Sequence, residues 1–270
     1  MAAPSPRPSP RSSPRSARAL VPQCVACSLV TVPVVVLALA AAVALVVGPF
    51  PLIYWRSFWC VETEDHVDAR YFRPEVCISP VERTEAITRL VKAMAALLDS
   101  RDVDYWVDSG TLLGQFRRQA VIPWDTDADF GVTEQGFAML RDLEWSVPRG
   151  YELQVMDSER YYSEERDWNV PARLVDTALG FYVDVFVFAE SLVQGDIAML
   201  GPPASDSWAN CVHCVRIGRQ GAARLLLLPK SYVFPLLRCP FADFTVLCPA
   251  RRTLYLEHLY GADFRVEKRT

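Results

Sequence analysis

Asp125, Asp127 and Asp129 alternate with single residues in the segment IPWDTDADFG. If this segment is extended, residues two apart project from the same face of the chain, so the three carboxylates point the same way. Carboxylates held side by side repel one another unless a cation neutralises them. Mg²⁺ and Mn²⁺ prefer oxygen ligands, and Mg²⁺ is typically held by one or two carboxylates together with substrate phosphates. The spacing therefore predicts a site for Mg²⁺ or Mn²⁺.

Asp184 is the single charged residue in the apolar stretch LGFYVDVFVF at residues 179–188. A stretch that is apolar on both faces is typical of a central strand buried on both sides of a sheet. An ionised carboxylate buried there needs a cation beside it, because otherwise it would become protonated. Two partners are open at this point. Asp184 binds the same metal as the three aspartates, or it pairs with an arginine such as Arg173.

Gly110 and Thr111 begin a predicted short helix upstream of the aspartates. A glycine turn that leads into a helix N-terminus presents backbone N–H groups and the positive end of the helix dipole to phosphate. Arg117 follows less than two helical turns later, and its guanidinium either binds an anionic oxygen or lies exposed on the helix. Phosphate-binding groups beside a metal site are the parts that phosphoryl transfer requires.

Three blocks of this sequence resemble the LicD family, which includes bacterial phosphocholine transferases, fukutin and fukutin-related protein. The blocks are SGTLLG with Arg117 and IPWDTDAD, then FYVDVF around Asp184, and finally PFADFTVLCPARRTLYLEHLYGADF. They occur in the family's order over roughly residues 80–265. The resemblance implies a nucleotidyltransferase-like fold. In that fold Asp127, Asp129 and Asp184 bind the metal, and Gly110, Thr111 and Arg117 contact phosphate.

The activity that the resemblance implies is metal-dependent transfer of a phospho-alcohol group. The group would be ribitol phosphate, glycerol phosphate or phosphocholine, the donor would be CDP-linked, and the acceptor would be a hydroxyl of a glycan or glycoprotein, with release of CMP. Asp125 or one of the metal-binding carboxylates would accept the proton of that hydroxyl. The alternatives are a nucleotide-sugar glycosyltransferase, against which SGTLLG and Arg117 count, and an inactive lumenal binding protein, against which the complete carboxylate set counts.

Apolar periodicity predicts the elements that must position these residues. The most regular helix is Pro80–Asp99, which Ser79 and Glu82 begin as a capping box. Helices and strands alternate without an internal repeat, so we expect an α/β (α+β) domain with a mixed sheet flanked by helices. We predict strands at 103–107, 128–132, 151–156, 171–175 and 179–188, further helices at 111–118, 134–143 and 251–260, and a loose region after Glu190.

The first 55 residues predict one N-terminal transmembrane helix. No residue between Arg18 and Arg56 is charged, and the apolar run Cys24–Val47 is long enough to cross a hydrocarbon core about 30 Å thick. Four arginines precede the run, so the positive-inside rule predicts a single-pass type II protein of the Golgi or endoplasmic reticulum membrane, with its catalytic domain in the lumen. The alternatives are a cleaved signal peptide and a buried helix of a soluble protein, which would show a polar face. We expect a disordered cytosolic tail at 1–20, the signal anchor and interface at 21–55, a short stem at 56–78 and the catalytic domain at 79–270.

Six cysteines follow the apolar run, and an even number in an oxidising lumen favours disulfides. They are Cys60, Cys77, Cys211, Cys214, Cys239 and Cys248. Six cysteines allow too many pairings for the sequence to choose among them. A zinc site that joins Cys211 and Cys214 to Cys239 and Cys248 is the alternative, although the second pair is spaced too widely for a usual zinc motif.

Composition and charge exclude two further classes of protein. The chain is 51% hydrophobic and 22% charged, which excludes disorder throughout. Its formal net charge of −4 is divided unevenly, because the first 20 residues carry four arginines and no acid and the remainder therefore sums to −8. An acidic domain lacks the basic face that phosphate neutralisation requires, so we expect no nucleic-acid partner.

Overall fold

The computed structural model describes residues 34–39, 41, 43, 59–61, 66–160, 170–192, 197–202, 211–217 and 223–267. The chain divides into two units, Met1–Tyr54 and Trp55–Thr270. In the first unit, residues 34–39, 41 and 43 are helical and exposed. Among the residues that the structure describes, no helix has both the length and the apolar character needed to cross a membrane. The predicted tail and most of the run Cys24–Val47 lie outside the described residues, so the membrane anchor stays a prediction.

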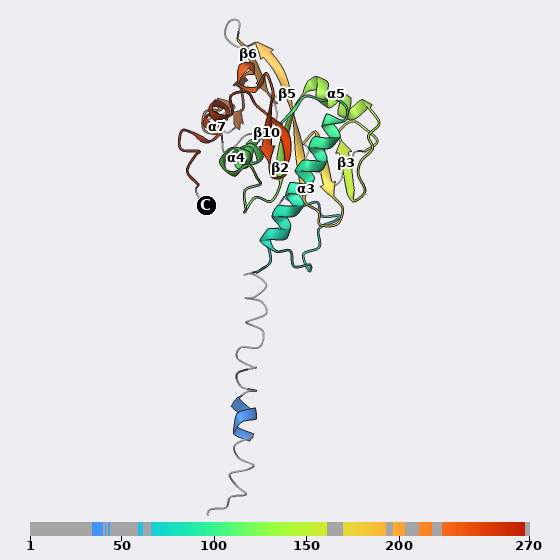
Figure 1. Ribbon diagram of the computed structural model, residues 1–270, viewed down its shortest axis with the longest axis vertical. Coiled ribbons are helices and arrows are strands. Elements are labelled where there is room, and N and C mark those ends of the chain that lie inside the picture. The colour runs from blue at the N-terminus through green and yellow to red at the C-terminus, as the bar shows by residue number, and fades with distance from the viewer. Residues whose placement is uncertain are drawn as a thin grey trace, which may run out of the picture. The chain divides into compact units, whose positions relative to one another are not determined.

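The second unit is built on a seven-stranded mixed sheet, with five strands in the order β1-β2-β5-β4-β3 (Figure 1). Strands β2 and β5 are parallel, and the other neighbouring pairs are antiparallel. Two short strands extend the sheet beyond β5, since β6 pairs with β5 and β9 with β6. The bounds are β1 (Tyr105–Val107), β2 (Ala128–Thr133), β3 (Tyr151–Val155), β4 (Ala172–Asp176), β5 (Tyr182–Leu192), β6 (Ala198–Gly201) and β9 (Leu228–Pro229).

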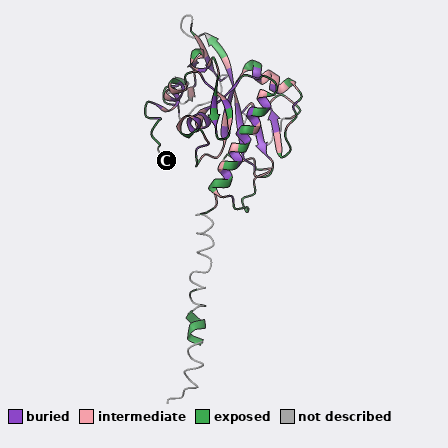
Figure 2. Cartoon of the chain, in the orientation of Figure 1, coloured by how far each residue is buried: buried purple, intermediate pink, exposed green. Residues whose placement is uncertain are grey.

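Helices α3 (Pro80–Asp99) and α5 (Glu134–Asp142) pack against the sheet. Helix α3 begins at the predicted capping box, in which Glu82 N donates to Ser79 Oγ at 3.2 Å and Ser79 N donates to Glu82 Oε2 at 2.8 Å. Its apolar stripe is completely buried, and burying each large apolar side chain stabilises the fold by about 1.5–3 kcal/mol. Figure 2 shows this division, with the strands mostly buried and α3 carrying both buried and exposed residues. The stripe consists of Ile87, Leu90, Val91, Met94 and Leu98.

Three further helices and two hairpins complete the second unit. Helix α4 packs on β2 and on α7, α6 also packs on α7, and β11 lies beside β1. The helices are α4 (Ser109–Arg118), α6 (Lys230–Val233) and α7 (Arg252–Tyr260), and the hairpins are β7 (Val215–Ile217) with β8 (Ala223–Leu225) and β10 (Leu237–Phe241) with β11 (Phe244–Cys248).

The predicted mixed sheet flanked by helices is confirmed, and each strand and helix predicted between residues 80 and 188 is present, with ends shifted by at most a few residues. The helix predicted at 251–260 is present as α7, whereas the loose region predicted between Glu190 and this helix contains the strands β6 to β11. These strands are short and obtain their hydrogen bonds from partners far along the chain or across tight turns. In the β10–β11 hairpin, buried and more exposed residues alternate, which places Phe241 and Val246 in the core.

The six cysteines that follow the apolar run form three disulfides in the structure. The pairs are Cys60–Cys77, Cys211–Cys214 and Cys239–Cys248. The predicted disulfides are thus present. The alternative zinc site made from both of the last two pairs is not formed.

Candidate active site

A row of polar residues crosses three neighbouring strands at the centre of the sheet. Asp129 on β2 is the register partner of Asp184 on β5, and Asp184 is in turn the register partner of Arg173 on β4. Register partners place their side chains on the same face of a sheet. The residues that alternate with them, such as Val183 and Val185, belong to the hydrophobic core. The parallel pairing of β2 with β5 therefore brings together two aspartates that are far apart in the sequence.

Asp184 forms a bidentate ion pair with Arg173. Arg173 Nε donates to Asp184 Oδ1 at 2.6 Å and Arg173 Nη2 donates to Asp184 Oδ2 at 2.9 Å, and both side chains are buried. The guanidinium also stacks on the ring of Tyr182, with Cζ 3.5 Å from the ring centroid. The alternative in which Asp184 pairs with Arg173 is therefore confirmed. Removing one member of such a buried pair would leave the other charge unpaired at high cost.

The aspartates of the IPWDTDADFG segment face one another near the N-terminus of α4. Burial and the neighbouring Asp127 carboxylate raise the pKa of Asp125 to about 7. Burial, followed by the charges of Asp127, Asp184 and two further carboxylates, raises the pKa of Asp129 well above its ordinary value. A like charge disfavours ionisation, so a bound cation would stabilise the ionised form of these carboxylates.

Asp108 is a further carboxylate in this cluster and was missed by the sequence analysis. It is completely buried, and it caps α4 because Ser109 N donates to its Oδ1 at 2.7 Å. Tyr255 OH donates to the same oxygen at 2.7 Å, whereas Asp108 Oδ2 is buried without a hydrogen-bond partner in the described part of the chain. Burial raises the pKa of Asp108 to about 6. Its position directly before Ser109 and Gly110, at an N-cap, was the sequence signal that could have identified it.

Gly110 and Thr111 hold the aspartate segment against α4. Thr111 Oγ1 accepts a hydrogen bond from Asp129 N at 2.8 Å. A Cβ atom at Gly110 would lie 2.9 Å from Asp125 Oδ2, so a side chain at this position would displace the Asp125 carboxylate. The structure therefore brings both predicted phosphate-binding residues beside the predicted metal-binding residues.

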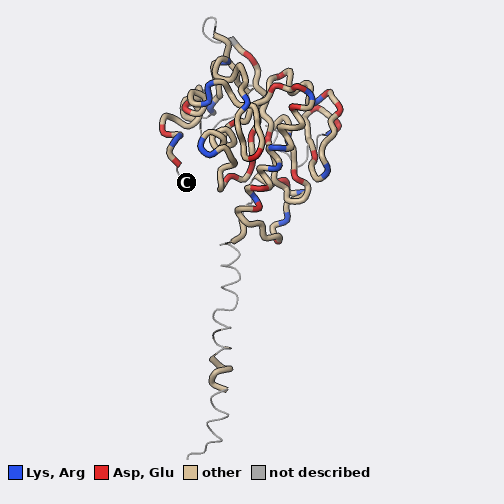
Figure 3. The backbone as a smooth tube through the Cα atoms, in the orientation of Figure 1, with Lys and Arg blue, Asp and Glu red and all other residues tan. Residues whose placement is uncertain are grey.

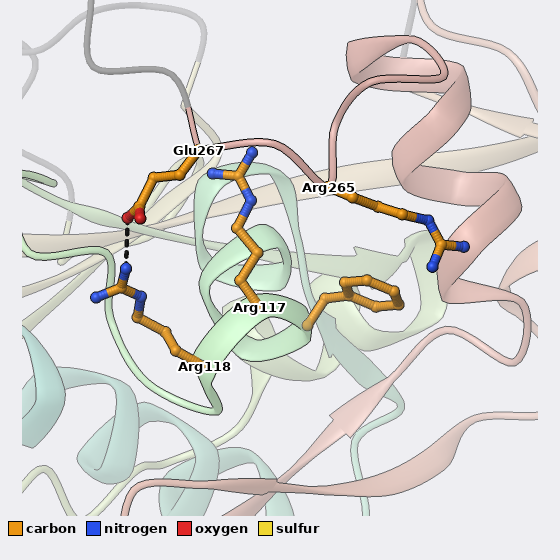
Figure 4. Close-up of a pocket in the computed structure, with 5 residues that line it drawn as sticks. Arg117, Arg118, Arg265 and Glu267 are labelled. Carbon is orange, nitrogen blue, oxygen red and sulfur yellow. Dashed lines mark hydrogen bonds and ion pairs between the residues drawn. The ribbon is translucent and has the colours of Figure 1, made fainter.

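In the structure, Arg117 contacts the backbone near the C-terminus of the chain. Its guanidinium holds the C-terminal segment, with Nε donating to Phe264 O at 3.0 Å and Nη2 donating to Val266 O at 2.9 Å. Arg117 also lines a cavity of about 380 Å³ together with Phe116, Arg118, Arg265 and Glu267. Figure 4 shows Arg118 paired with Glu267 in this cavity, while Arg265 extends away from Arg117.

Two segments outside the predicted motifs also reach the carboxylates. Tyr260, at the end of α7, lies beside them, since burial and the charges of Asp129, Asp108 and Asp125 raise its pKa. His66 belongs to the predicted stem, and its Nδ1 lies 3.0 Å from Asp127 Oδ2. No local sequence signal identifies His66, whereas Tyr260 falls in the closing block of the resemblance.

The residues of this cluster fit a divalent cation in charge and in chemistry. All of the candidate ligands are carboxylates, and burial and neighbouring carboxylates raise the pKa values of Asp125 and Asp129. In the described part of the chain, the buried oxygen Asp108 Oδ2 has no hydrogen-bond partner. The cation would compete with Arg173 for Asp184. Among the described residues, three other possible metal ligands have ligand atoms that all lie within 4.8 Å of one another. They are Cys211, Cys214 and His258, and none of them belongs to the carboxylate cluster.

Charged residues of both signs occur throughout the described part of the second unit. Figure 3 shows acidic and basic residues interspersed over it.

Comparison with known proteins relates these motifs to one family. Residues 102–251, more than half of the chain, match the family model described as LicD/FKTN/FKRP, nucleotidyltransferase domain. Human ribitol 5-phosphate transferase FKRP is 23% identical over 80% of this chain and 35% of its own length, and the mouse protein of the same name is 24% identical over 65% and 31%. Uncharacterized protein RP689 of Rickettsia prowazekii (strain Madrid E) is 40% identical over 22% of each chain. The chain thus spans about a third of the length of the FKRP relatives that it matches.

Proposed function

Because the chain belongs to the LicD/FKTN/FKRP family of nucleotidyltransferase domains, we propose that it is a transferase for a phospho-alcohol group. The donor is a CDP-linked alcohol, which carries ribitol phosphate, glycerol phosphate or phosphocholine. The acceptor is a hydroxyl group of a glycan or glycoprotein, and CMP is released. The names of the human and mouse relatives, which specify ribitol 5-phosphate transfer, favour ribitol phosphate among these groups.

The observation that carries the proposal is the meeting of Asp129 and Asp184 in register on β2 and β5, beside the N-terminus of α4. Asp127, Asp129 and Asp184 would hold Mg²⁺ or Mn²⁺ in this arrangement. When bound, the cation neutralises the negative charge of the donor diphosphate. The repulsion that raises the pKa of Asp129 is the physical reason to expect a cation at this place.

The remaining residues of the site bind the donor and move the proton. The N–H groups of Gly110 and Thr111, at the start of α4, are suited to phosphate oxygens. Asp125 is the candidate base for the acceptor hydroxyl, because its pKa of about 7 allows it to take up a proton near neutral pH. Nε and Nη2 of Arg117 donate to backbone carbonyl groups of residues 264 and 266. Its present contacts support a role in anchoring the C-terminal segment.

We propose that this domain acts in the lumen of the Golgi or the endoplasmic reticulum, anchored by the run Cys24–Val47 as a type II protein. The three disulfides support an oxidising compartment. In intact microsomes, the lumenal region around Asp184 should resist added protease and become sensitive after detergent is added. Digestion of this region in sealed vesicles would contradict the proposed orientation.

The activity is tested with the full chain in detergent. CDP-ribitol, CDP-glycerol, CDP-choline and UDP-sugars are supplied separately, with and without Mn²⁺, and nucleotide release is measured. We expect one CDP donor to release CMP in a Mn²⁺-dependent manner, and we expect Asp129→Asn to abolish that release. The matched control is Asp104→Asn, which changes an exposed carboxylate. Faster turnover of a UDP-sugar would favour a glycosyltransferase, and no turnover of any donor would favour an inactive binding protein.

A further inference from the structure

The segment Cys211–Cys214 docks against the C-terminal end of α7. Val212 N donates to Leu259 O at 2.8 Å, and His213 N donates to His258 O at 3.1 Å. Both cysteines are buried, at 4% and 7% exposure, so the segment forms part of the packed domain. These backbone hydrogen bonds hold the two cysteines over the last turn of the helix, next to His258.

This contact brings three side chains of metal-binding types close together. The sulfur atoms of Cys211 and Cys214 and a ring nitrogen of His258 all lie within 4.8 Å of one another. Nε2 of His258 is buried and, within the described ranges, has no hydrogen-bond partner. A buried polar atom without a partner carries a free-energy cost that a ligand would remove.

We propose that Cys211, Cys214 and His258 form a zinc site when the two cysteines are thiols. Two thiolates and one imidazole are a ligand set that suits Zn²⁺, which prefers four ligands in tetrahedral arrangement. The exposed His213 lies nearby, with its ring centroid 6.1 Å from that of His258. The site consists of sulfur and nitrogen ligands, whereas the proposed catalytic cation is bound by carboxylate oxygens. It does not depend on the proposed transferase activity.

In the structure Cys211 and Cys214 are joined as a disulfide, so zinc binding and the disulfide are alternative states of the same residues. A dithiol reductant passes two electrons and two protons to the disulfide, gives two cysteine thiols and itself becomes a disulfide. Zinc binding then releases the two thiol protons, because the thiolates are the ligands. The cysteine segment contacts α7, the helix whose Tyr255 hydroxyl donates to Asp108 in the candidate active site.

The first test uses Co²⁺ as a spectroscopic substitute for Zn²⁺. The full chain in detergent is reduced with a phosphine, freed of metal and titrated with Co²⁺. We expect the absorption bands of tetrahedral, sulfur-ligated cobalt. We expect His258→Gln to weaken binding at least about tenfold, since loss of an outer-shell partner alone typically costs roughly 10–100-fold. The double variant Cys239→Ser with Cys248→Ser should keep the bands, because it removes thiols that the proposal does not use. Equal spectra for the wild-type protein and His258→Gln would overturn the proposal.

The second test requires no variant and therefore does not depend on the folding of one. Zinc K-edge X-ray absorption of the reduced, zinc-loaded wild-type chain should show two sulfur ligands at about 2.3 Å and the remainder nitrogen or oxygen at about 2.0–2.1 Å. A site with four sulfurs, or with none, would overturn the assignment. Neither outcome bears on nucleotide release, so a failure here is distinguishable from a failure of the proposed transferase activity.

Discussion

Asp125→Asn should stabilise the metal-free protein and at the same time reduce its activity. The substitution keeps the size of the side chain and removes its negative charge. An unperturbed aspartate has a pKa of 3.8, whereas burial and Asp127 raise that of Asp125 to about 7. Each pKa unit corresponds to about 1.4 kcal/mol, so ionising Asp125 in the folded protein costs on the order of 4 kcal/mol. Asparagine avoids this cost but must satisfy its amide group, so we expect a net gain of about 2–4 kcal/mol at pH 8.

The pH dependence of this gain follows from linkage. Because the folded-state pKa of Asp125 lies above the unfolded value, its favourable contribution is fully present below about pH 4 and is lost as the pH rises to about 7. The wild-type protein therefore loses stability over this window, and the variant loses less. The difference between them should be small at pH 4 and largest above pH 7.

The assay is urea unfolding of the full chain in detergent with EDTA, at pH 5 and pH 8, together with nucleotide release in Mn²⁺. A gain of about 2–4 kcal/mol corresponds to a rise of roughly 4–16 °C in melting temperature for a domain of this size. Activity should fall by about 10²–10⁴-fold if Asp125 is the base. Asp104→Asn should change stability by no more than about 0.5 kcal/mol, because its side chain is exposed. Lower stability of Asp125→Asn at pH 8, or full activity, would refute this reasoning.

Three further substitutions test other parts of the site. Asp127→Ala should abolish metal-dependent nucleotide release while leaving the metal-free melting temperature unchanged or higher, because it relieves repulsion among crowded carboxylates. Arg173→Ala should lower the free energy of unfolding by about 3–5 kcal/mol in urea titrations, because it leaves Asp184 buried without its ion-pair partner. Gly110→Ala should reduce turnover and cost about 1–3 kcal/mol of stability, because its Cβ would lie 2.9 Å from Asp125 Oδ2.

Each of these substitutions has a control or a contradicting outcome. Arg238→Ala removes an exposed ion pair with Asp99 and should cost no more than about 1 kcal/mol, so an equal cost for Arg173→Ala would contradict the importance of burial. A large loss of metal-free stability in Asp127→Ala would indicate that the aspartate segment has a structural role instead. Unchanged turnover in Gly110→Ala would show that Asp125 can move without harm to the site.

The sequence by itself determined the features that depend on local chemistry. The capping box at Ser79 and Glu82 identified the start of α3, because a cap is a contact between residues three apart. The apolar stretch around Asp184 identified β5 as a buried strand, because burial on both faces demands apolar residues at every position except one with a partner. The alternation of Asp125, Asp127 and Asp129 identified the carboxylate cluster. Comparison with known proteins then confirmed the family that these motifs resemble.

The tertiary structure alone decided which residues meet. The register of β5 against its two neighbours gives Asp184 both Asp129 and Arg173, and nothing in the local sequence encodes that register. Asp108 N donates to Asp129 O, and the Asp108 carboxylate accepts from Tyr255, which lies far along the chain. Arg117 contacts the C-terminal segment. Caps and periodicity act between neighbouring residues, whereas the Asp129–Asp184 register and the contacts of Arg117 form between distant segments. Such contacts depend on how the whole chain packs. A single sequence therefore suggests possible contact partners, and the tertiary structure shows which of them meet.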